Sequence, residues 1–371
     1  MAMLKVSAFV LLLFCGELFA CTGLRLTATD KAVVTGRTVE FGRVLKMSTA
    51  VIPHHYTFTG KSSKGDGLVY TAKYAAVGVY CFDEQVLMDG INEEGLVAAA
   101  FYFPGYAEYG EITEENQDRS LSPVEFPNWI LTQFASLDEV REAIPTVVIA
   151  PTVTAGWGPT PPPFHYVVYD RQGRSLVIEP LGGELVVYEN PIGTITNSPT
   201  FDWHLTNLIN YLNLSPKNAQ PMTLRGVELT PFGMGSGMVG LPGDFTPPSR
   251  FVRAALFSSY ATPSKNGPEA VNQTFHLLNN FDIPKGIAVG KGESDFTQLT
   301  SVKEADSKRY YFKTYGNQTI RYLDLMKFDL DAEEIVSGPT SGASSSGYLQ
   351  SLTDDSDRIL PQRAQRGTEG V

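Results

Sequence analysis

Residues 21–42 read CTGLRLTATDKAVVTGRTVEFG and mark the start of the fold. Polar and apolar side chains alternate on both sides of the short polar stretch at 29–31, a pattern typical of strands with one buried face. Two such runs around a turn predict a β-hairpin. The first strand begins with Cys21, and the return strand carries Arg37 and Glu40. The role of this cysteine depends on the segment that precedes it, residues 1–20.

The segment before the hairpin has the pattern of a secretory signal. It carries Lys5 near its start, the apolar run VSAFVLLLF at 6–14, and the small residue Ala20 at the expected cleavage site. The apolar run is too short to cross a membrane as a helix, and no later stretch of sequence qualifies, so we expect no stable membrane span. We expect residues 1–20 to be removed as a signal peptide, which leaves an exported protein, periplasmic or extracellular, that starts at Cys21.

The composition is that of a globular protein. Of the 371 residues, 43% are hydrophobic and 11% are aromatic, which is enough apolar surface to build a core. The formal net charge of −11 leaves no basic surplus that could neutralise the phosphates of a nucleic acid. These figures argue against a nucleic-acid partner.

Strand patterns dominate the chain, with helical patterns between them. Residues 164–197 (FHYVVYDRQGRSLVIEPLGGELVVYENPIGTITN) predict an antiparallel meander, because alternating runs are separated by turn residues. Apolar residues spaced by three and four predict helices within 122–144, 202–213 and 249–260. We expect an α+β protein with one domain over residues 21–336. From 337 the sequence changes to SGPTSGASSSG and then to polar residues, so we expect residues 337–371 to form a flexible tail.

The histidines and cysteines give no sign of a metal site or a cofactor. The sequence contains no HExxH, no paired CxxC, no phosphate-binding glycine loop and no GxSxG elbow. Cys15 lies in the signal segment, which leaves Cys21 and Cys81 in the mature protein. Cys81 lies in an apolar run, where a cysteine is most simply a small buried hydrophobe. We expect both thiols to be free, with no metal and no cofactor bound.

Cys21 itself can supply a nucleophile and a base. Cleavage after Ala20 would give Cys21 a free α-amine, a group that titrates near ~7.7–8.0 and can therefore take the thiol proton at neutral pH. A positive side chain nearby would favour the thiolate, and a carboxylate could orient the amine. Arg37 and Glu40 are candidates, although residues three apart on a regular strand leave opposite faces. Both can reach one thiol only through a twist, a bulge or a backbone contact.

Four blocks of sequence give the chain a family resemblance. Residues 21–42, GINEEGLVAAAFYFPGYAEY at 90–109, GTITNSPTFDWHLTNL at 193–208 and GLPGDFTPPSRFVRAALF at 240–257 resemble the choloylglycine hydrolase family. This family of N-terminal-nucleophile hydrolases includes bile salt hydrolases and penicillin V acylases. The blocks occur in the family's order, and the resemblance covers roughly residues 21–335. It implies a four-layer αββα sandwich of two antiparallel sheets, often assembled as a homotetramer.

The resemblance also implies roles for individual residues. It implies that Cys21 is the nucleophile, with its own amine as the base, and that Arg37 contacts the thiol. Glu40 occupies the position where the family usually has Asp beside the amine; the extra methylene requires the carboxylate to be placed differently. Asn197 matches the asparagine that forms half of the oxyanion hole, and Tyr102 matches the other half, where the donor can be a backbone N–H.

Arg250 matches an arginine that supports the site. The implied reaction is hydrolysis of a linear, non-peptide acyl amide. Tyr102 favours a penicillin V acylase-like substrate, with N-acyl homoserine lactones and conjugated bile salts as the other options. We expect Phe41, Phe101, Phe103 and the loop at 156–164 to line the acyl pocket, since such pockets are mostly apolar.

A second interpretation of Cys21 belongs to another class of protein. LFAC at 18–21 is similar to a lipidation signal, which would make the chain a membrane-tethered binding protein. Lipidation converts the thiol to a thioether and acylates the amine, so it would remove both catalytic groups. Against it, a strand starts directly at Thr22 and leaves no flexible spacer from the membrane.

Overall fold

The hairpin predicted at residues 21–42 forms and begins the smaller of two antiparallel sheets. The structure is a computed structural model that describes residues 20–290 and 293–340. β1 (Cys21–Thr27) pairs with β2 (Val33–Phe41) so that Cys21 lies opposite Val39. In the described part of the chain this sheet has the order β1-β2-β17-β18-β19, with β16 paired to β17. Its other strands are β16 (Ala288–Gly290), β17 (Glu293–Glu304), β18 (Arg309–Thr314) and β19 (Asn317–Asp324).

The larger sheet contains the predicted meander at one edge. Its order over the described residues is β13-β12-β11-β8-β7-β6-β3-β20, with every neighbouring pair antiparallel. The strands are β3 (Met47–Ile52), β6 (Ala76–Cys81), β7 (Asp89–Asn92), β8 (Val97–Tyr102), β11 (Phe164–Tyr169), β12 (Ser175–Leu181), β13 (Glu184–Glu189) and β20 (Val336–Pro339). The expected meander at 164–197 is confirmed as β11, β12 and β13.

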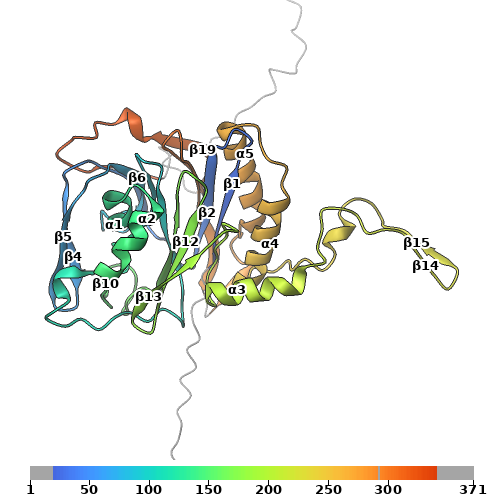
Figure 1. Ribbon diagram of the computed structural model, residues 1–371, viewed down its shortest axis with the longest axis horizontal. Coiled ribbons are helices and arrows are strands. Elements are labelled where there is room, and N and C mark those ends of the chain that lie inside the picture. Colours follow the sequence, from blue (N-terminus) through green and yellow to red (C-terminus); the bar gives the residue numbers. More distant parts are fainter. Residues whose placement is uncertain (1–19, 291–292, 341–371) are drawn as a thin grey trace, which may run out of the picture.

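Helices cover the outer faces of the two sheets (Figure 1). α4 packs on β1 and α5 packs on β2 and β17, while α1 packs on β7 and β8 on the opposite side of the molecule. This arrangement confirms the expected four-layer αββα sandwich. The α-helices are α1 (Phe126–Gln133), α2 (Leu137–Ala143), α3 (Phe201–Leu208), α4 (Pro247–Tyr260) and α5 (Gly267–Leu278). None of the helices in residues 20–290 and 293–340 has the length and apolar character needed to cross a membrane.

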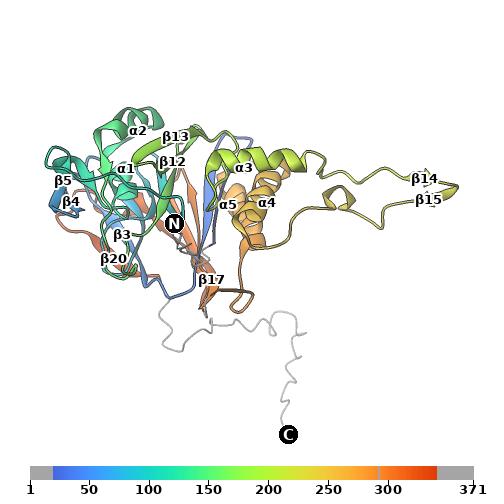
Figure 2. The same cartoon turned by 90° about the horizontal axis from the view of Figure 1, so that it is seen from below.

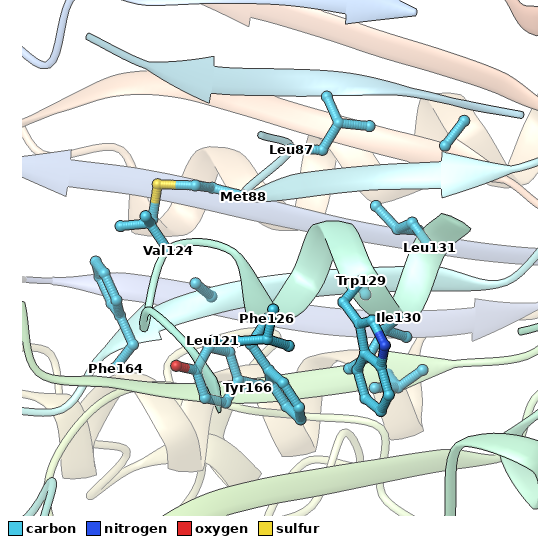
Figure 3. Packing of buried hydrophobic residues seen from close by; sticks show 14 of the residues in the cluster. Leu87, Met88, Leu121, Val124, Phe126, Trp129, Ile130, Leu131, Phe164 and Tyr166 are labelled. Atoms are coloured by element: carbon cyan, nitrogen blue, oxygen red, sulfur yellow. The ribbon is translucent and has the colours of Figure 1, made fainter. Parts of the chain in front are cut away.

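Three apolar cores fill the spaces between the four layers. Between the sheets, Val77, Val97 and Phe101 pack against Leu299 and Phe312. A second core lies between the larger sheet and α1, where Phe126, Trp129, Ile130 and Tyr166 gather (Figure 3). A third core lies between the smaller sheet and helices α4 and α5; its members include Leu24, Val34, Ala254, Phe275 and Leu278. The two faces of every central strand are therefore buried against different partners.

The position of α5 depends on a glycine in β2. A Cβ atom at Gly36 would lie 2.5 Å from Cγ2 of Thr274 and 2.8 Å from Cδ1 of Leu278, so only glycine allows the helix to approach this closely. The helix starts at Asn266, whose side chain accepts a hydrogen bond from the Glu269 N–H, an N-cap contact that satisfies one free end group. Gly36 also shows which face of β2 is turned toward α5, and Glu40, four residues on, shares that face.

The remaining elements are short. The predicted helix at 122–144 is split into α1 and α2, and the other two helical predictions are confirmed as α3 and α4. Two hairpins and one short parallel pair lie outside the main sheets: β4 (Thr57–Ser62) with β5 (Gly65–Thr71), β14 (Met222–Leu224) with β15 (Val227–Leu229), and β9 (Ser120–Leu121) with β10 (Val148–Ile149). Single 3₁₀ turns occur at Gln117–Arg119, Ile144–Thr146, Ile209–Tyr211, Ser236–Met238, Asn279–Phe281 and Leu325–Lys327.

The described fold continues past residue 336, where we expected it to end. β20 pairs with β3 through Pro339, and the Thr340 hydroxyl donates to the Met47 carbonyl at 2.8 Å. The prediction that the fold ends at residue 336 was therefore wrong. Small and polar residues suggested a tail, but an edge strand is held by main-chain hydrogen bonds, and Pro339 is tolerated there because an edge needs only one side paired. The rest of the expected tail (341–371) and residues 1–19 of the expected signal lie outside the described residues.

A long arm leaves the body between α3 and α4. It runs over residues 212–246 and carries β14 and β15 at its tip, far from both sheets (Figures 1 and 2). Every residue of these two strands is exposed. Several large apolar side chains lie along the arm without cover from the body, namely Leu212, Met222, Leu224, Val227, Leu229, Phe232, Met234 and Val239.

Candidate active site

Cys21 lies at the edge of the space between the two sheets. It is 5% exposed, and its side chain shares a face of the hairpin with Val39, its direct partner, and with Arg37. Arg37 lies within hydrogen-bonding reach of the thiol. Burial lowers the pKa of Arg37, but the charges of Cys21 and Asp89 more than offset this, so that the pKa lies above its ordinary value. A fixed positive charge therefore stands beside the sulfur.

The guanidinium of Arg37 is held from three directions. Nη1 donates to the Ala100 carbonyl at 2.6 Å, Nε donates to the Thr38 carbonyl at 3.4 Å, and the group lies 3.9 Å above the centre of the Phe101 ring. Ala100 and Phe101 belong to β8 of the larger sheet, so this contact joins the two sheets at the site. Because Arg37 is buried and fully engaged, its charge cannot move away from Cys21.

Glu40 leaves the opposite face of β2, as its spacing from Arg37 predicted. Its side chain is buried, and Oε1 accepts from the Thr297 hydroxyl at 2.7 Å. Burial raises the pKa of Glu40 to about 8, against the opposing charge of Arg250. Glu40 reaches the start of β1 through its backbone: its N–H donates to the Ala20 carbonyl at 3.1 Å. This contact is made by the backbone of Glu40 and not by its carboxyl group.

The side chain of Asn197 contacts three other residues of the site. Its Oδ1 accepts from the Cys21 main-chain nitrogen at 2.8 Å and from Nη2 of Arg250 at 2.7 Å. Its Nδ2 donates to the Tyr102 carbonyl at 2.7 Å. A side-chain amide carries two N–H donors, so the contact with Tyr102 leaves one for another acceptor. Asn197 is almost completely buried, which fixes the direction of that second N–H.

Arg250 ties this asparagine to the first strand. It lies in the first turn of α4, is fully buried, and donates to the Thr22 hydroxyl at 2.9 Å, to the Cys21 carbonyl and, through Nε, to the Phe245 carbonyl at 2.8 Å. Burial lowers the pKa of Arg250 to about 10, although the charges of Glu40 and Cys21 work in the other direction. At neutral pH it remains a cation.

A narrow cavity of about 40 Å³ opens beside the Cys21 side chain. Phe41 lines it, as expected, and so do Trp157 and Phe164 from the predicted loop; the Trp157 ring meets the Phe41 and Phe164 rings edge-on at 5.7 and 5.1 Å. The full lining is Cys21, Arg37, Val39, Glu40, Phe41, Leu45, Met47, Val79, Cys81, Met88, Asp89, Ala100, Tyr102, Trp157 and Phe164.

The structure does not place Phe101 and Phe103 in this cavity, so their expected role as pocket residues was wrong. Successive residues of β8 point to opposite faces, and Ala100 and Tyr102 occupy the face that borders the cavity. Phe101 instead lies beneath Arg37, and Phe103 stacks on the ring of His165 with centroids 4.3 Å apart. Of the three phenylalanines, Phe41 alone lines the cavity.

Comparison with known proteins identifies the family of the chain. The sequence model of the linear amide C–N hydrolases, choloylglycine hydrolase family, matches residues 21–338. The chain belongs to this family. It is therefore a linear amide C–N hydrolase, with both the fold and the reaction class that the sequence blocks implied.

Relatives of this hydrolase cover almost its whole described length. The bile salt hydrolase/transferase of Clostridium perfringens is 36% identical over 321 residues, which is 85% of this chain and 95% of the relative. A crystal structure of a cysteine-to-alanine variant of conjugated bile acid hydrolase from Clostridium perfringens has a TM-score of 0.79 at 33% identity and covers 90% of this chain and 99% of that one. The penicillin V acylase of Agrobacterium tumefaciens, at 23% identity and a TM-score of 0.70, covers 86% and 92% and shares the fold.

Sequence reasoning missed a buried charge at the edge of the hydrolase's cavity. Asp89 accepts from the hydroxyls of Ser301 and Tyr310 at 2.7 and 2.6 Å and from the Lys303 ammonium group. These partners lie on the smaller sheet and Asp89 on the larger, so the cluster joins the sheets behind Arg37. An aspartate inside the apolar run around Cys81 was the available signal, since a buried charge needs partners.

Both cysteines of the described residues are free and buried, as expected. Cys81 also lines the cavity, and burial raises the pKa of its thiol to about 12, against the charge of Arg37. That thiol stays protonated at neutral pH, which distinguishes it from a nucleophile. Over residues 20–290 and 293–340, His, Cys, Asp and Glu side chains form no group of three or more that could hold a metal ion.

Proposed function

We propose that the hydrolase cleaves acyl amides with the Cys21 thiolate as nucleophile and the α-amine of Cys21 as base. The observation that carries the proposal is the position of the Cys21 main-chain nitrogen, 2.8 Å from Oδ1 of Asn197. The carbonyl of the preceding residue, Ala20, accepts a hydrogen bond from the Glu40 N–H. The bond between Ala20 and Cys21 therefore lies inside the site. Removal of residues 1–20 leaves an amine where the amide nitrogen now lies.

The arrangement supports a two-step reaction. The amine takes the thiol proton, and the sulfur forms a bond to the carbonyl carbon while the electron pair moves to the carbonyl oxygen. The second N–H of the Asn197 side chain and the main-chain N–H of Tyr102 are the proposed donors to that oxygen. The amine then gives its proton to the leaving nitrogen as the C–N bond breaks. Water, deprotonated by the same amine, hydrolyses the resulting thioester.

Two variants of the N-terminus test this mechanism. Cys21→Ala is expected to abolish hydrolysis while the protein stays folded, because no other thiol near the site is ionised. A chain that retains Ala20 is expected to be equally inactive, because its Cys21 nitrogen is an amide without a basic lone pair. Intact mass establishes which form is present. Activity in a pure preparation of either variant would overturn the mechanism.

The shape of the cavity bears on the substrate. About 40 Å³ is room for roughly three water molecules, and the rings of Phe41, Trp157 and Phe164 form part of the cavity wall. A flat ring or a straight chain enters such a slot with less displacement of the walls than a steroid. We therefore propose acyl amides with an aryl or linear acyl group, such as penicillin V or an N-acyl homoserine lactone, as the preferred substrates; Tyr102 at the cavity agrees with this.

Conjugated bile salts are the second candidate substrate class. Their support is the 36% identity to a bile salt hydrolase/transferase over 95% of that relative, against 23% to the penicillin V acylase structure. Comparing kcat/KM for penicillin V, an N-acyl homoserine lactone and glycocholate decides between the classes. A preference for glycocholate by tenfold or more would contradict the argument from the cavity.

The lipidated alternative is not favoured. Lipidation requires the Cys21 sulfur to carry a diacylglyceryl group at a membrane surface, yet Cys21 is buried as the first residue of a paired strand. The next residue, Thr22, is completely buried, so no spacer separates the strand from the modified position. A diacylglyceryl adduct in the intact mass would overturn this conclusion and the hydrolytic mechanism together.

We also propose that the enzyme is exported and that it works as a homotetramer. Export rests on the signal pattern of residues 1–20. Assembly is supported by the arm at 212–246, whose apolar side chains would otherwise remain in water. A second copy of this chain is the partner that the proposal names, since the arm extends well beyond its own body (Figure 2).

A further inference from the structure

Two buried histidines lie behind Asn197, and neither of them borders the cavity beside Cys21. His204 belongs to α3 and is 2% exposed, and His165 belongs to β11 and is 1% exposed. A histidine is rarely buried this deeply without hydrogen-bond partners. Both rings face the main chain of the segment that presents Asn197, which raises the question of what they contribute to it.

His204 holds the main chain of Asn197 itself. Its Nε2 lies 2.9 Å from the Asn197 carbonyl, an acceptor, so Nε2 carries the proton. Burial lowers the pKa of His204 to about 4, which keeps the ring neutral and leaves that single N–H as its donor. The ring stacks on Phe251 of α4 with centroids 4.6 Å apart and planes 12° from parallel. Within the described residues Nδ1 has no hydrogen-bond partner, so the Nε2 contact is the one polar contact that orients the ring.

His165 holds the preceding peptide in the same way. Its Nε2 lies 3.1 Å from the Thr196 carbonyl, and its Nδ1 lies 3.0 Å from Oε1 of Glu179. The same carboxylate oxygen accepts from the Phe201 N–H at 3.0 Å, at the first residue of α3. Glu179 therefore connects His165 to the helix that carries His204. Two successive carbonyls of the Asn197 segment are fixed by histidines that are tied to one another.

The side chain of Asn197 depends on this support. Its carboxamide is shared between Cys21, Arg250 and Tyr102, which leaves one N–H to meet the developing oxyanion. An oxyanion donor is effective only within about 2.7–3.1 Å of the charged oxygen. Rotation of the Asn197 peptide would move the Cα and swing that N–H out of range, and His204 holds the carbonyl that such a rotation must displace.

We propose that His204 is a positioning residue of the oxyanion hole: its Nε2–H fixes the Asn197 peptide and thereby aims the side-chain amide at the substrate carbonyl. The proposal rests on the function proposed for Cys21 and Asn197. It assigns His204 no proton transfer, because its ring does not line the cavity and its one N–H is held by the Asn197 carbonyl. It also explains why a buried histidine stands at this point of α3 with only one of its nitrogens satisfied.

A pair of variants isolates the Nε2–H donor. His204→Gln can place its own Nε2 donor near the same carbonyl, whereas His204→Phe keeps a ring that can stack on Phe251 but has no donor. We expect His204→Phe to lower kcat by about 10- to 100-fold with KM within twofold, since a misplaced donor costs less than the 10²–10³ of a deleted one. We expect His204→Gln to stay within about threefold of the unaltered enzyme. Trp203→Phe, a change on the exposed side of the same helix, is the matched control.

Two further readouts separate positioning from general damage. Alkylation of Cys21 by iodoacetamide is expected to proceed at the unaltered rate in His204→Phe, because the thiolate and its amine are untouched. The pH dependence of kcat/KM is expected to keep its shape in both variants, because His204 titrates far below the working range. If His204→Phe does not fold, His204→Met, which also lacks the donor, takes its place.

The outcomes divide cleanly. Equal kcat in folded His204→Phe and unaltered enzyme, or equal losses in His204→Gln and His204→Phe, would overturn the positioning role. If the unaltered enzyme cleaves no acyl amide, the proposed function is wrong, whatever the role of His204. The positioning role is then tested through the NMR signal of the Asn197 side-chain amide. That signal, assigned with Asn197→Asp, should shift in the Phe variant and not in the Gln variant; no shift in either would refute the inference.

Discussion

Replacement of Asn197 by alanine tests the centre of the site, because this side chain has separable chemical and structural contacts. The chemical part is the second N–H of Nδ2, the proposed donor to the oxyanion. The structural part comprises the hydrogen bonds to Tyr102, Cys21 and Arg250. Alanine removes both parts, while Asn197→Asp keeps an Oδ1 acceptor for Cys21 and Arg250 and removes only the N–H donors. Comparison of the two variants therefore separates the loss of kcat caused by the missing N–H donor from the loss of stability caused by the missing hydrogen bonds.

The expected magnitudes follow from those contacts. Loss of one oxyanion donor lowers kcat by about 10²–10³, and both variants lose that donor. Both variants remove the donor to the Tyr102 carbonyl, whereas only Asn197→Ala also removes the acceptor for the Cys21 nitrogen and for Nη2 of Arg250. A buried polar group that loses its partner costs about 1–3 kcal/mol. We expect Asn197→Ala, which takes a partner from three groups, to reduce the free energy of unfolding by about 3–9 kcal/mol in total. Asn197→Asp takes a partner from one group and is expected to reduce it by about 1–3 kcal/mol.

The assay compares turnover with stability in the same preparations. Release of the amine product from a saturating acyl amide gives kcat, and urea unfolding followed by tryptophan fluorescence gives the free energy. The expected pattern is an equal or greater loss of kcat in Asn197→Asp than in Asn197→Ala, with the opposite order for stability. If both variants keep kcat within about fivefold of the unaltered enzyme, Asn197 supplies no oxyanion donor and the reasoning is refuted.

Three other expectations rest on separate features. Burial raises the pKa of Glu40 from 4.5 to about 8, so the folded protein with Ala20 still attached holds a proton that the unfolded chain releases, and its stability should fall as pH rises from 4.5 to 8. Glu40→Gln should reduce the difference between the urea midpoints measured at pH 5.5 and 7.5. The same difference in the variant and in the unaltered protein would contradict this expectation. Replacing residues 219–235 by a short Gly-Ser linker should convert a tetramer to smaller species in light scattering, and an unchanged mass would show that the arm is not the contact. Gly36→Ala should destabilise the protein by about 1–3 kcal/mol, since the new Cβ atom would lie 2.5 Å from Thr274. The control is Gly338→Ala, whose Cβ atom would lie 3.5 Å from its nearest neighbour. Equal urea midpoints for the two variants would refute the packing argument.

The parts of the fold that were predictable are those encoded locally. Alternation and a turn within 22 residues predicted the first hairpin, and the alternation rule also placed Arg37 and Glu40 on opposite faces of β2. The rule could not say what each face would meet. Phe101 and Phe103 were expected in the pocket because they are large and apolar, but Phe101 faces Arg37 of the other sheet and Phe103, just past β8, stacks on His165 of β11; both positions are decided by tertiary packing.

The support of the site was not predictable because its contacts are distant in sequence. His165 meets a carbonyl 31 residues away and Asp89 meets hydroxyls more than 200 residues away, so no local pattern announces either. Lone histidines and aspartates carry no spacing signal of the kind that metal ligands show. The misplaced end of the fold at residue 336 has a similar cause, since β20 is held by main-chain pairing with β3 and needs no characteristic side chains.

These distant contacts explain why the site can be rigid although it is assembled from ends of elements. Asn197 lies in a loop, and loops ordinarily tolerate movement. Here its side chain and its carbonyl have partners on three of the layers: Cys21 on the smaller sheet, Tyr102 on the larger sheet, and Arg250 and His204 on helices α4 and α3. Movement of the loop would break several buried hydrogen bonds at once, each costly to leave unmade. Contacts from three layers thus hold the proposed oxyanion donor more firmly than any sequence neighbour could, which is why changes in α3, remote from the thiol, should lower kcat.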